Sequence, residues 1–270
     1  MSAVKKSLLV EQLRKNQMVE LLSKGKRVDG RGLSDYRNIK IELNIIEKAN
    51  GSAKVSIGNS QVVAGVKIAT GAPFPDTPDK GLLIVNAEVL PLASPYAEPG
   101  PPDEHTIELA RVVDRGIRES QMINLSKLVL IEGQKVYAVF VDVSVLDVDG
   151  NLFDATSYAA VASLATAKMP ELDVKGESTG QKIPLPIAGL PISVTQAKIG
   201  DILIIDPTSE EEAVMDARIT FTTDQEGNIC AVQKGLSGTL SFEQVLISAE
   251  TAQVKGNEIR ALLKKAIENG

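Results

Sequence analysis

The order of apolar and polar residues along the chain predicts short strands that alternate with amphipathic helices. Period-two alternation and short apolar runs, typical of strands, occur at residues 39–69, 82–92, 128–131, 192–197, 202–205, 217–222 and 229–234. Spacings of three and four residues, typical of helices, occur at residues 3–25, 103–122 and 241–267. The first strand range contains the turn pairs Asn50-Gly51 and Gly58-Asn59, so we expect it to form an antiparallel meander.

The longest apolar run, from Val136 to Leu146, lies near the middle of the chain. Almost every residue in it is apolar or β-branched, which predicts a strand covered on both faces. We therefore expect Asp142, inside this run, to be a buried acid satisfied by hydrogen bonds rather than a catalyst.

This run leads through a turn at residues 147–151 into a helix rich in Ala, Ser and Thr. We expect the helix to extend through Lys168 and to end at Pro170, with Asn151 or Asp154 capping its first free N–H groups. A buried strand that ends at a helix N-terminus is a natural anion site. Whether this anion site is used is the main functional question that the pattern raises.

A succession of several strands followed by a helix occurs twice, although the residues themselves do not repeat. This indicates a pseudo-duplicated sandwich of strands and helices. The polar stretch from Val174 to Gln181, with two glycines, marks the connection between the halves. We expect an N-terminal helical arm, a first half, a linker and a second half at residues 1–26, 27–170, 171–183 and 184–270.

The composition excludes several classes of function. Cys230 is the only cysteine and His105 the only histidine, so a disulfide or a thiolate metal cage is excluded within one chain. Zinc sites and Ser–His catalysis are nearly excluded for the same reason. Aromatic residues make up 3% of the chain, with no Trp, which argues against a base-stacking platform. Without a signal-peptide pattern or an apolar run of about 20 residues, we expect a soluble, cytoplasmic protein with no membrane contact, metal or cofactor.

Charge is distributed unevenly along the chain. The net charge of −6 argues against general polyanion binding, but residues 1–40 carry a net charge of +6 and the remainder −12. In the basic part, Arg27 and Arg31 flank an Asp-Gly turn. They can either pin the turn or reach an anion, and pinning is favoured.

Residues 103–122 are expected to form a helix capped by Asp103, with a row of arginines opposite its apolar face. The apolar positions are Leu109, Val112, Val113 and Ile117, and the arginines are Arg111, Arg115 and Arg118. Acidic residues three or four positions away could pair with these arginines within the helix; they are Glu108, Asp114 and Glu119. The row could equally form a surface for an anionic partner, and the helix alone does not decide between the two.

Several segments occur in the order in which a known enzyme family carries them. They are Arg27-Val-Asp-Gly-Arg31, Ala49-Asn-Gly-Ser52, IGNSQVVAGV from residue 57, Glu98 to Asp103, IELARVVDRGIR from residue 107, and Val141 to Asp149. Through these segments, spread over residues 25–265, the sequence resembles the RNase PH family of phosphorolytic 3′-to-5′ exoribonucleases. Within that family it is most similar to the non-catalytic subunits of the archaeal exosome ring. The resemblance implies an α+β, RNase PH-like fold of two pseudo-repeated βαβα halves with mixed and antiparallel sheets and packed helices.

The resemblance also implies partners. It predicts a hexameric ring, a trimer of heterodimers, in which this chain alternates with a catalytic RNase PH-like subunit around an RNA channel. RNA-binding cap proteins are expected at the mouth of the ring. Arg111, Arg115 and Arg118 would then line the path of single-stranded RNA and contact its phosphates without reading the sequence.

The catalytic groups of the family are missing or altered in this chain. Active members hold inorganic phosphate with a hydroxyl and an arginine at the turn after the central strand. Leu152 and Phe153 stand at those positions here, and Asp147 adds negative charge. Active members also carry two acids six residues apart; Asp216 matches the second, and Glu210 lies six residues before it in a shortened loop. We therefore expect a non-catalytic, RNA-binding structural subunit in which Glu210 and Asp216 are vestiges of a catalytic pair.

Two alternatives stay open at the level of the sequence. The chain could be a phosphorolytic 3′-to-5′ exoribonuclease in its own right that uses Glu210 and Asp216 with a substitute phosphate site. It could also be a purely structural subunit, in which case the arginine row serves only the fold.

Overall fold

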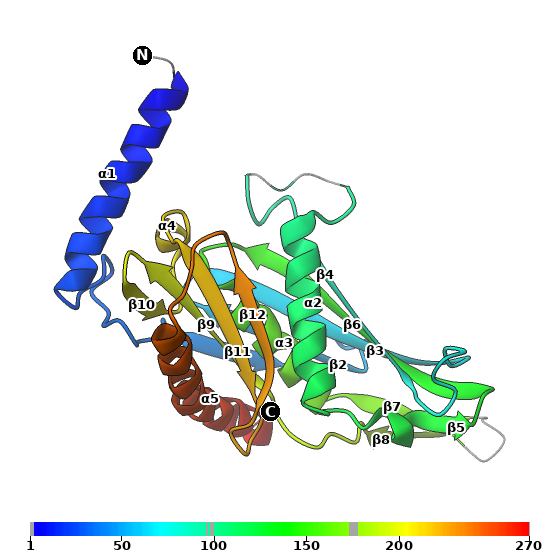
Figure 1. Cartoon of the computed structure of the whole chain (residues 1–270). Helices are drawn as coiled ribbons and strands as arrows, with labels where there is room; N and C mark the ends of the chain where they lie inside the picture. Colours follow the sequence, from blue (N-terminus) through cyan, green and yellow to red (C-terminus); the bar gives the residue numbers. More distant parts are fainter. Residues whose placement is uncertain (1–2, 96, 98–99, 173–177, 270) are drawn as a thin grey trace.

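Two β-sheets, with helices between and outside them, make up the body of the chain (Figure 1). The computed structural model describes residues 3–95, 97, 100–172 and 178–269. The first sheet has the strand order β1-β2-β3-β6-β4, with β5 paired to the start of β6. Its strands are β1 (Ile39–Leu43), β2 (Gly51–Ile57), β3 (Ser60–Gly71), β4 (Leu82–Val89), β5 (Val129–Ile131) and β6 (Lys135–Asp147).

The first sheet is mixed. Strands β1, β2 and β3 form the predicted antiparallel meander, and β3 also pairs antiparallel with β6. Strand β4 lies parallel to β6, because the chain between them crosses over through helix α2 (Glu104–Glu119). Together with the helices and the antiparallel second sheet, this arrangement confirms the predicted α+β class.

The central strand β6 is buried on both faces at residues 136–139 but on one face only beyond them, so the expectation of a doubly covered strand holds only for its start. Val139, Val141 and Val143 are buried. Asp142 points to the other face, where it is exposed and accepts a hydrogen bond from Asn86 Nδ2 at 3.1 Å. The expectation that Asp142 is buried is therefore wrong. An apolar run does not reveal whether another element packs on the second face of its sheet.

The second sheet is antiparallel throughout and has the order β10-β9-β11-β12. Its strands are β9 (Ile192–Ile199), β10 (Ile202–Ile205), β11 (Ala217–Thr223) and β12 (Ile229–Gly235). Strand β9 is buried on both faces, by α3 (Leu152–Ala165) and by α5 (Phe242–Asn269). Thr195 Oγ1 donates to Asp154 in α3 at 2.7 Å, whereas the next side chain, Gln196, donates to Ser248 O in α5 at 2.8 Å.

Helix α3 lies at the centre of the fold, in contact with β2 and β3 of the first sheet and β9 of the second. Its residues from Phe153 to Leu164 are all buried. Small side chains let both sheets approach the helix closely, which explains the Ala, Ser and Thr composition of this segment. Helix α2 packs beside α3 and against β4 and β12.

Helix α3 ends at Ala165 rather than extending through Lys168 as expected, and a strand pair follows. Met169, the residue before Pro170, disfavours helical backbone, so the helix cannot extend to the proline. The linker expected at residues 171–183 overlaps this strand pair, and its residues 173–177 lie outside the described part of the chain. The two antiparallel strands are β7 (Lys168–Leu172) and β8 (Ser178–Pro184).

Helix α1 (Ala3–Ser23) extends away from the body of the molecule (Figure 1). Its C-terminal part packs on the second sheet, where Met18 and Leu22 are buried in a small apolar cluster with residues of β9 and β10. An ion pair between Lys15 and Asp216 adds a polar contact on the same side.

The turn after α1 is pinned to the second half of the chain, which decides between the two roles considered for its arginines. The Arg27 guanidinium is buried, bonds both carboxylate oxygens of Glu211, and donates to Ile205 O at 2.7 Å. Arg31 Nη1 donates to Asp206 Oδ2 at 2.9 Å. Both arginines hold the fold together, and pinning is confirmed.

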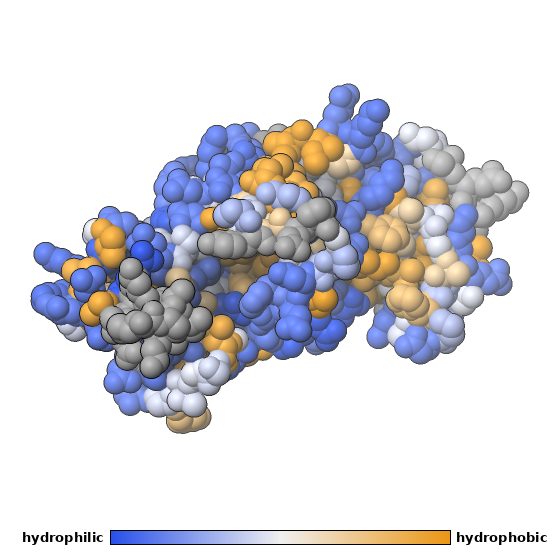
Figure 2. Space-filling model, turned by 90° about the horizontal axis from the view of Figure 1, so that it is seen from above, coloured by the Kyte–Doolittle hydropathy of each residue, from blue (hydrophilic) through white to orange (hydrophobic). Residues whose placement is uncertain are grey.

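The surface carries separate apolar patches among polar residues when the molecule is seen from above (Figure 2). Several large apolar side chains are mostly exposed, among them Leu92 at 73% and Phe242 at 79%. Single exposed side chains of this kind are normal on any protein surface, whereas contiguous apolar patches mark surfaces that meet another protein.

Candidate functional site

Helix α2 presents the arginine row because its cap and its apolar face fix its orientation. Asp103 Oδ1 accepts a hydrogen bond from Thr106 N at 2.8 Å, so the helix begins where the sequence predicts. The predicted apolar residues are all buried beneath the helix; they are Leu109, Val112, Val113 and Ile117. The arginines on the other side are all exposed; they are Arg111, Arg115 and Arg118.

Arg111 is open. Its guanidinium makes no hydrogen bond or ion pair with any residue that the structure describes. The acid three residues before it, Glu108, instead accepts hydrogen bonds from Arg218 at 2.8 Å and from Gln233 at 2.9 Å. Pairing within the helix, one of the two explanations of the row, therefore does not account for Arg111.

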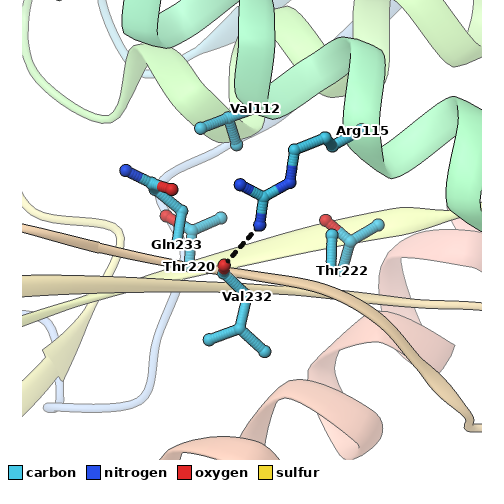
Figure 3. Close-up of a pocket in the computed structure, with 7 residues that line it drawn as sticks. Val112, Arg115, Thr220, Thr222, Val232 and Gln233 are labelled. Carbon is cyan, nitrogen blue, oxygen red and sulfur yellow. Dashed lines mark hydrogen bonds between the residues drawn. The ribbon is translucent and has the colours of Figure 1, made fainter.

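Arg115 is only lightly held. It reaches across to strand β12, where Nη2 donates to Val232 O at 2.9 Å (Figure 3). The guanidinium lies over a small depression between α2 and the strands β11 and β12, with Thr220 and Gln233 in its lining. This single bond to a carbonyl leaves the positive charge of Arg115 without a carboxylate partner among the described residues.

Arg118 is firmly held. Its Nη2 and Nε donate to the two carboxylate oxygens of Asp114 at 2.7 and 3.1 Å, and Nη2 also donates to Leu83 O on β4 at 3.0 Å. Intrahelical pairing therefore explains Arg118. The three arginines, alike in the sequence, differ in the structure: within the part of the chain that is described, a carboxylate matches the charge of Arg118 but not the charges of the other two.

The turn after β6 is packed against a loop that brings carboxylates to the start of α3. Gly150 has a left-handed φ of +81°, and a Cβ there would lie 2.5 Å from Pro207 O. Asn151 N donates to Glu212 Oε1 at 2.9 Å, and Asn151 Nδ2 donates to Asp206 Oδ1 at 2.8 Å. Carboxylates of the chain itself therefore bond Asn151 at the N-cap position of α3 and bring negative charge to the place where an anion would bind.

The cationic side chain beside this turn, Arg37, is paired with a carboxylate. Arg37 donates from Nη2 to Asp206 Oδ1 at 2.8 Å and from Nε to Asp206 Oδ2 at 2.9 Å. It also bonds the carbonyl oxygens of Asp149 and Gly150. Because its charge is matched by Asp206, Arg37 does not form a phosphate site here.

Asp154 does not cap α3 as expected but ties the helix to the second sheet and to the start of the first. It accepts hydrogen bonds from Thr195 Oγ1 at 2.7 Å, Thr195 N at 3.1 Å and Tyr36 Oη at 2.8 Å. Burial, opposed by bonds from Asn151 and Thr195, raises the pKa of Asp154 to about 6. Asn151 occupies the N-cap position in a left-handed conformation, but its side chain makes no capping bond.

Phe153 has acquired a packing role. The Arg218 guanidinium lies over its ring, with Cζ 3.8 Å from the ring centroid. Both side chains are buried, and Arg218 turns its Nη2 toward Glu108 on α2. The position where active family members carry a phosphate-binding arginine thus supports another arginine that already has a partner.

The two candidate vestigial acids lie on different elements. Glu210 is exposed on the short helix α4 (Ser209–Glu212), whereas Asp216 precedes β11 and accepts from Gly200 N at 2.8 Å. Partial burial alone would raise the pKa of Asp216, but hydrogen bonds from Lys15 and Gly200 and the charge of Lys15 lower it. Asp216 is therefore an ionised carboxylate that joins the β9–β10 turn to α1.

Sequence reasoning missed the residues that decide which arginines are open. Arg218 and Gln233 come from β11 and β12, and their bonds to Glu108 span 110 and 125 residues. In the sequence, Arg218 is one polar position in an alternating strand. Among the described residues, three or more His, Cys, Asp or Glu side chains nowhere form a group that could hold a metal ion. The part of the chain that the structure describes also contains no helix long and apolar enough to cross a membrane.

The sequence matches two family models in succession. Residues 35–170 match the model described as RNase PH, 3′ exoribonuclease family, domain 1, and residues 189–254 match domain 2 of the same family. The chain is 52% identical to the exosome complex component Rrp42 of Pyrococcus horikoshii over 266 residues, covering 96% of this chain and 97% of that protein. It is 48% identical to the component of the same name from Thermoplasma acidophilum over 252 residues, covering 93% and 95%.

Solved structures are similar over nearly the whole chain. A chain of the Archaeoglobus fulgidus exosome, solved with RNA bound to the active site, superposes with a TM-score of 0.88 at 45% identity, covering 94% of this chain and 98% of that one. A chain of an archaeal exosome core gives a TM-score of 0.85 at 42% identity, with coverages of 95% and 98%. Rice Rrp46, at 17% identity and a TM-score of 0.69 over 89% of this chain and all of that one, shares the fold.

Proposed function

This chain belongs to the RNase PH family of 3′ exoribonucleases, and from that premise we propose that it is a non-catalytic, RNA-binding subunit of an exosome core ring. The observation that carries the proposal is the occupied N-terminus of α3. Phosphorolysis needs an inorganic phosphate held and neutralised next to the scissile bond. Here Glu212 and Asp206 bond the backbone N–H and the side-chain amide of Asn151 at this helix end, and their negative charge opposes a bound phosphate.

The RNA-binding part of the proposal rests on α2. Arg111 and Arg115 are exposed, and neither charge is matched by a carboxylate among the described residues. Exposed guanidinium groups one helical turn apart suit a phosphate backbone, because such contacts need no particular base. Arg118 belongs to the same row, but its charge is matched by Asp114, so we expect it to contribute least.

The partners follow from the family and the surface. We propose that the chain alternates with a catalytic RNase PH-like subunit in a trimer of heterodimers, with RNA-binding cap proteins at the mouth of the ring, in the cytoplasm. The similarity to exosome core chains supports ring assembly, and the exposed Leu92 and Phe242 supply apolar surface for it. In this arrangement the arginines of α2 serve an active site that belongs to the partner.

The test compares three samples in one phosphorolysis assay: this chain alone, a catalytic RNase PH-like partner alone, and the equimolar mixture. Each sample receives single-stranded RNA and inorganic phosphate, the release of nucleoside diphosphates is followed, and native mass is measured in parallel. We expect activity in the mixture, at the mass of a hexamer, and none from this chain alone. Phosphate-dependent release by this chain alone would instead support an active enzyme that uses Glu210 and Asp216, and would refute the proposal.

A further inference from the structure

Arg111 lies between two acids that would pair with it in an isolated helix. Glu108 is three residues before it and Asp114 three residues after it. Neither carboxylate is free in the folded chain. Glu108 is bound by Arg218 from β11, and Asp114 is bound by Arg118 from the next turn of α2. Arg218 and Arg118 therefore occupy the two carboxylates, and Arg111 is left without an acidic partner among the described residues.

Residues from three other elements, α3, β11 and β12, hold the Glu108 carboxylate in place. The Arg218 guanidinium lies over the Phe153 ring of α3, and its Nη2 donates to Glu108 Oε1 on α2 at 2.8 Å. Gln233 on β12 donates to the same oxygen at 2.9 Å. The side chains of Arg218 and Glu108 are only 8% and 25% exposed, so water screens their attraction less than that of a surface pair. Partial burial alone would raise the pKa of Glu108, but the bonds from Arg218 and Gln233 lower it.

We propose that Arg218 and Arg118 are positioning residues that hold the acids flanking Arg111 and so keep Arg111 available for RNA phosphate. A free carboxylate beside Arg111 would compete with phosphate for the guanidinium, because both are anions that bind it in the same fork geometry. Phe153, which cannot bind phosphate itself, contributes as the surface on which Arg218 rests. The inference rests on the proposed RNA contact of Arg111.

The first test is Arg218→Met in the assembled ring, with a fluorescent single-stranded RNA as the probe at low salt. Without Arg218, Glu108 is free to pair with Arg111, and RNA affinity should fall by about twofold to fivefold, the range of an exposed ion pair. Adding Glu108→Gln to the same variant removes the competing charge and should restore the affinity. Because Glu108→Gln also relieves a half-buried carboxylate left without its partner, the rescue supports the positioning role only if the single and double variants have the same thermal transition.

The second test uses the exposed pair and does not disturb the interior. Arg118→Met should lower RNA affinity by a similar factor, because Asp114 becomes free for Arg111, and Asp114→Asn in the same background should restore it. This pair keeps the inference testable if Arg218→Met does not fold, as judged by its thermal transition and by the native mass of the ring.

Rescue by the neutral acid in both pairs supports the inference. Losses that are not rescued overturn it, as does unchanged affinity in both single variants. Arg111→Gln, measured in the same series, separates the inference from the function on which it rests. If Arg111→Gln weakens binding while the acid-holding variants do not, the proposed RNA contact stands and the positioning role falls. If Arg111→Gln binds like the wild type, the RNA contact of Arg111 fails and the positioning role fails with it.

Discussion

The double substitution Arg111→Gln and Arg115→Gln tests the RNA path most directly. Glutamine keeps most of the length of the side chain and has a helix propensity close to that of arginine, so α2 should persist. The buried face of the helix is not changed, because both arginines are exposed on the opposite side. The substitution therefore removes two positive charges and, with Arg115, one hydrogen bond to Val232 O.

The size of the effect follows from the two open guanidinium groups. Each phosphate contact on single-stranded nucleic acid contributes about 0.7 to the slope of log K against log salt, so losing two lowers the slope by about 1.4. Between about 50 and 200 mM salt, a fourfold range, the wild type should lose about sevenfold more affinity than the double variant. Weaker binding at low salt should accompany this flatter dependence.

The measurement is fluorescence anisotropy of a labelled single-stranded RNA titrated with the assembled ring over a salt series. Native mass shows whether each variant still assembles. Arg14→Gln serves as the matched control, because Arg14 is exposed on α1, which packs against β9 and β10. That edge of the second sheet is opposite β12, where Arg115 bonds. Parallel log–log lines for the wild type and the double variant, with equal ring mass, would remove these arginines from the RNA path.

Two further predictions concern stability of the isolated chain, measured by urea unfolding. Because the pKa of Asp154 is about 6 in the fold against an ordinary 3.8, its contribution is full below about pH 4 and is lost as pH rises through about 6. The stability of wild type relative to Asp154→Asn should thus fall by about 3 kcal/mol between about pH 4 and pH 7, and a pH-independent difference would contradict this reasoning. Gly51→Ala should destabilise the chain by several kcal/mol, since the added Cβ would lie 2.3 Å from Ser163 O in α3. Gly71→Ala, whose Cβ would have nothing within 4 Å, is the control and should be nearly neutral. Equal stabilities of the two variants would show that α3 moves to make room for the added Cβ.

The sequence predicted the elements whose pattern is local. Helix α2 begins at its Asp103 cap and buries the predicted apolar residues, because a cap and a three-to-four spacing are properties of neighbouring residues. The strands of the second half and α5 occur close to where the pattern places them. The end of α3 was predicted too late, since the Ala-rich pattern does not show where the chain turns into β7.

Burial was harder to predict than secondary structure. Asp142 lies in an apolar run but is exposed, because the second face of β6 is covered only at residues 136–139. The sequence has no signal for this, since coverage depends on where distant elements pack. The sequence favours a pinning role for Arg27, but only the fold reveals its partner Glu211, 184 residues away.

The sequence by itself determined what this chain lacks and what it offers. The side chains of Leu152 and Phe153 cannot bind phosphate in any fold, and three arginines on one side of a helix follow from their spacing. Only the tertiary structure decided which of these arginines are open. Asp114 binds Arg118 within the helix, but Glu108 is taken by Arg218, because β11 and α3 bring that guanidinium beside α2. Ion pairs form between groups that folding brings within a few ångströms, and in this chain the deciding pair is separated by 110 residues.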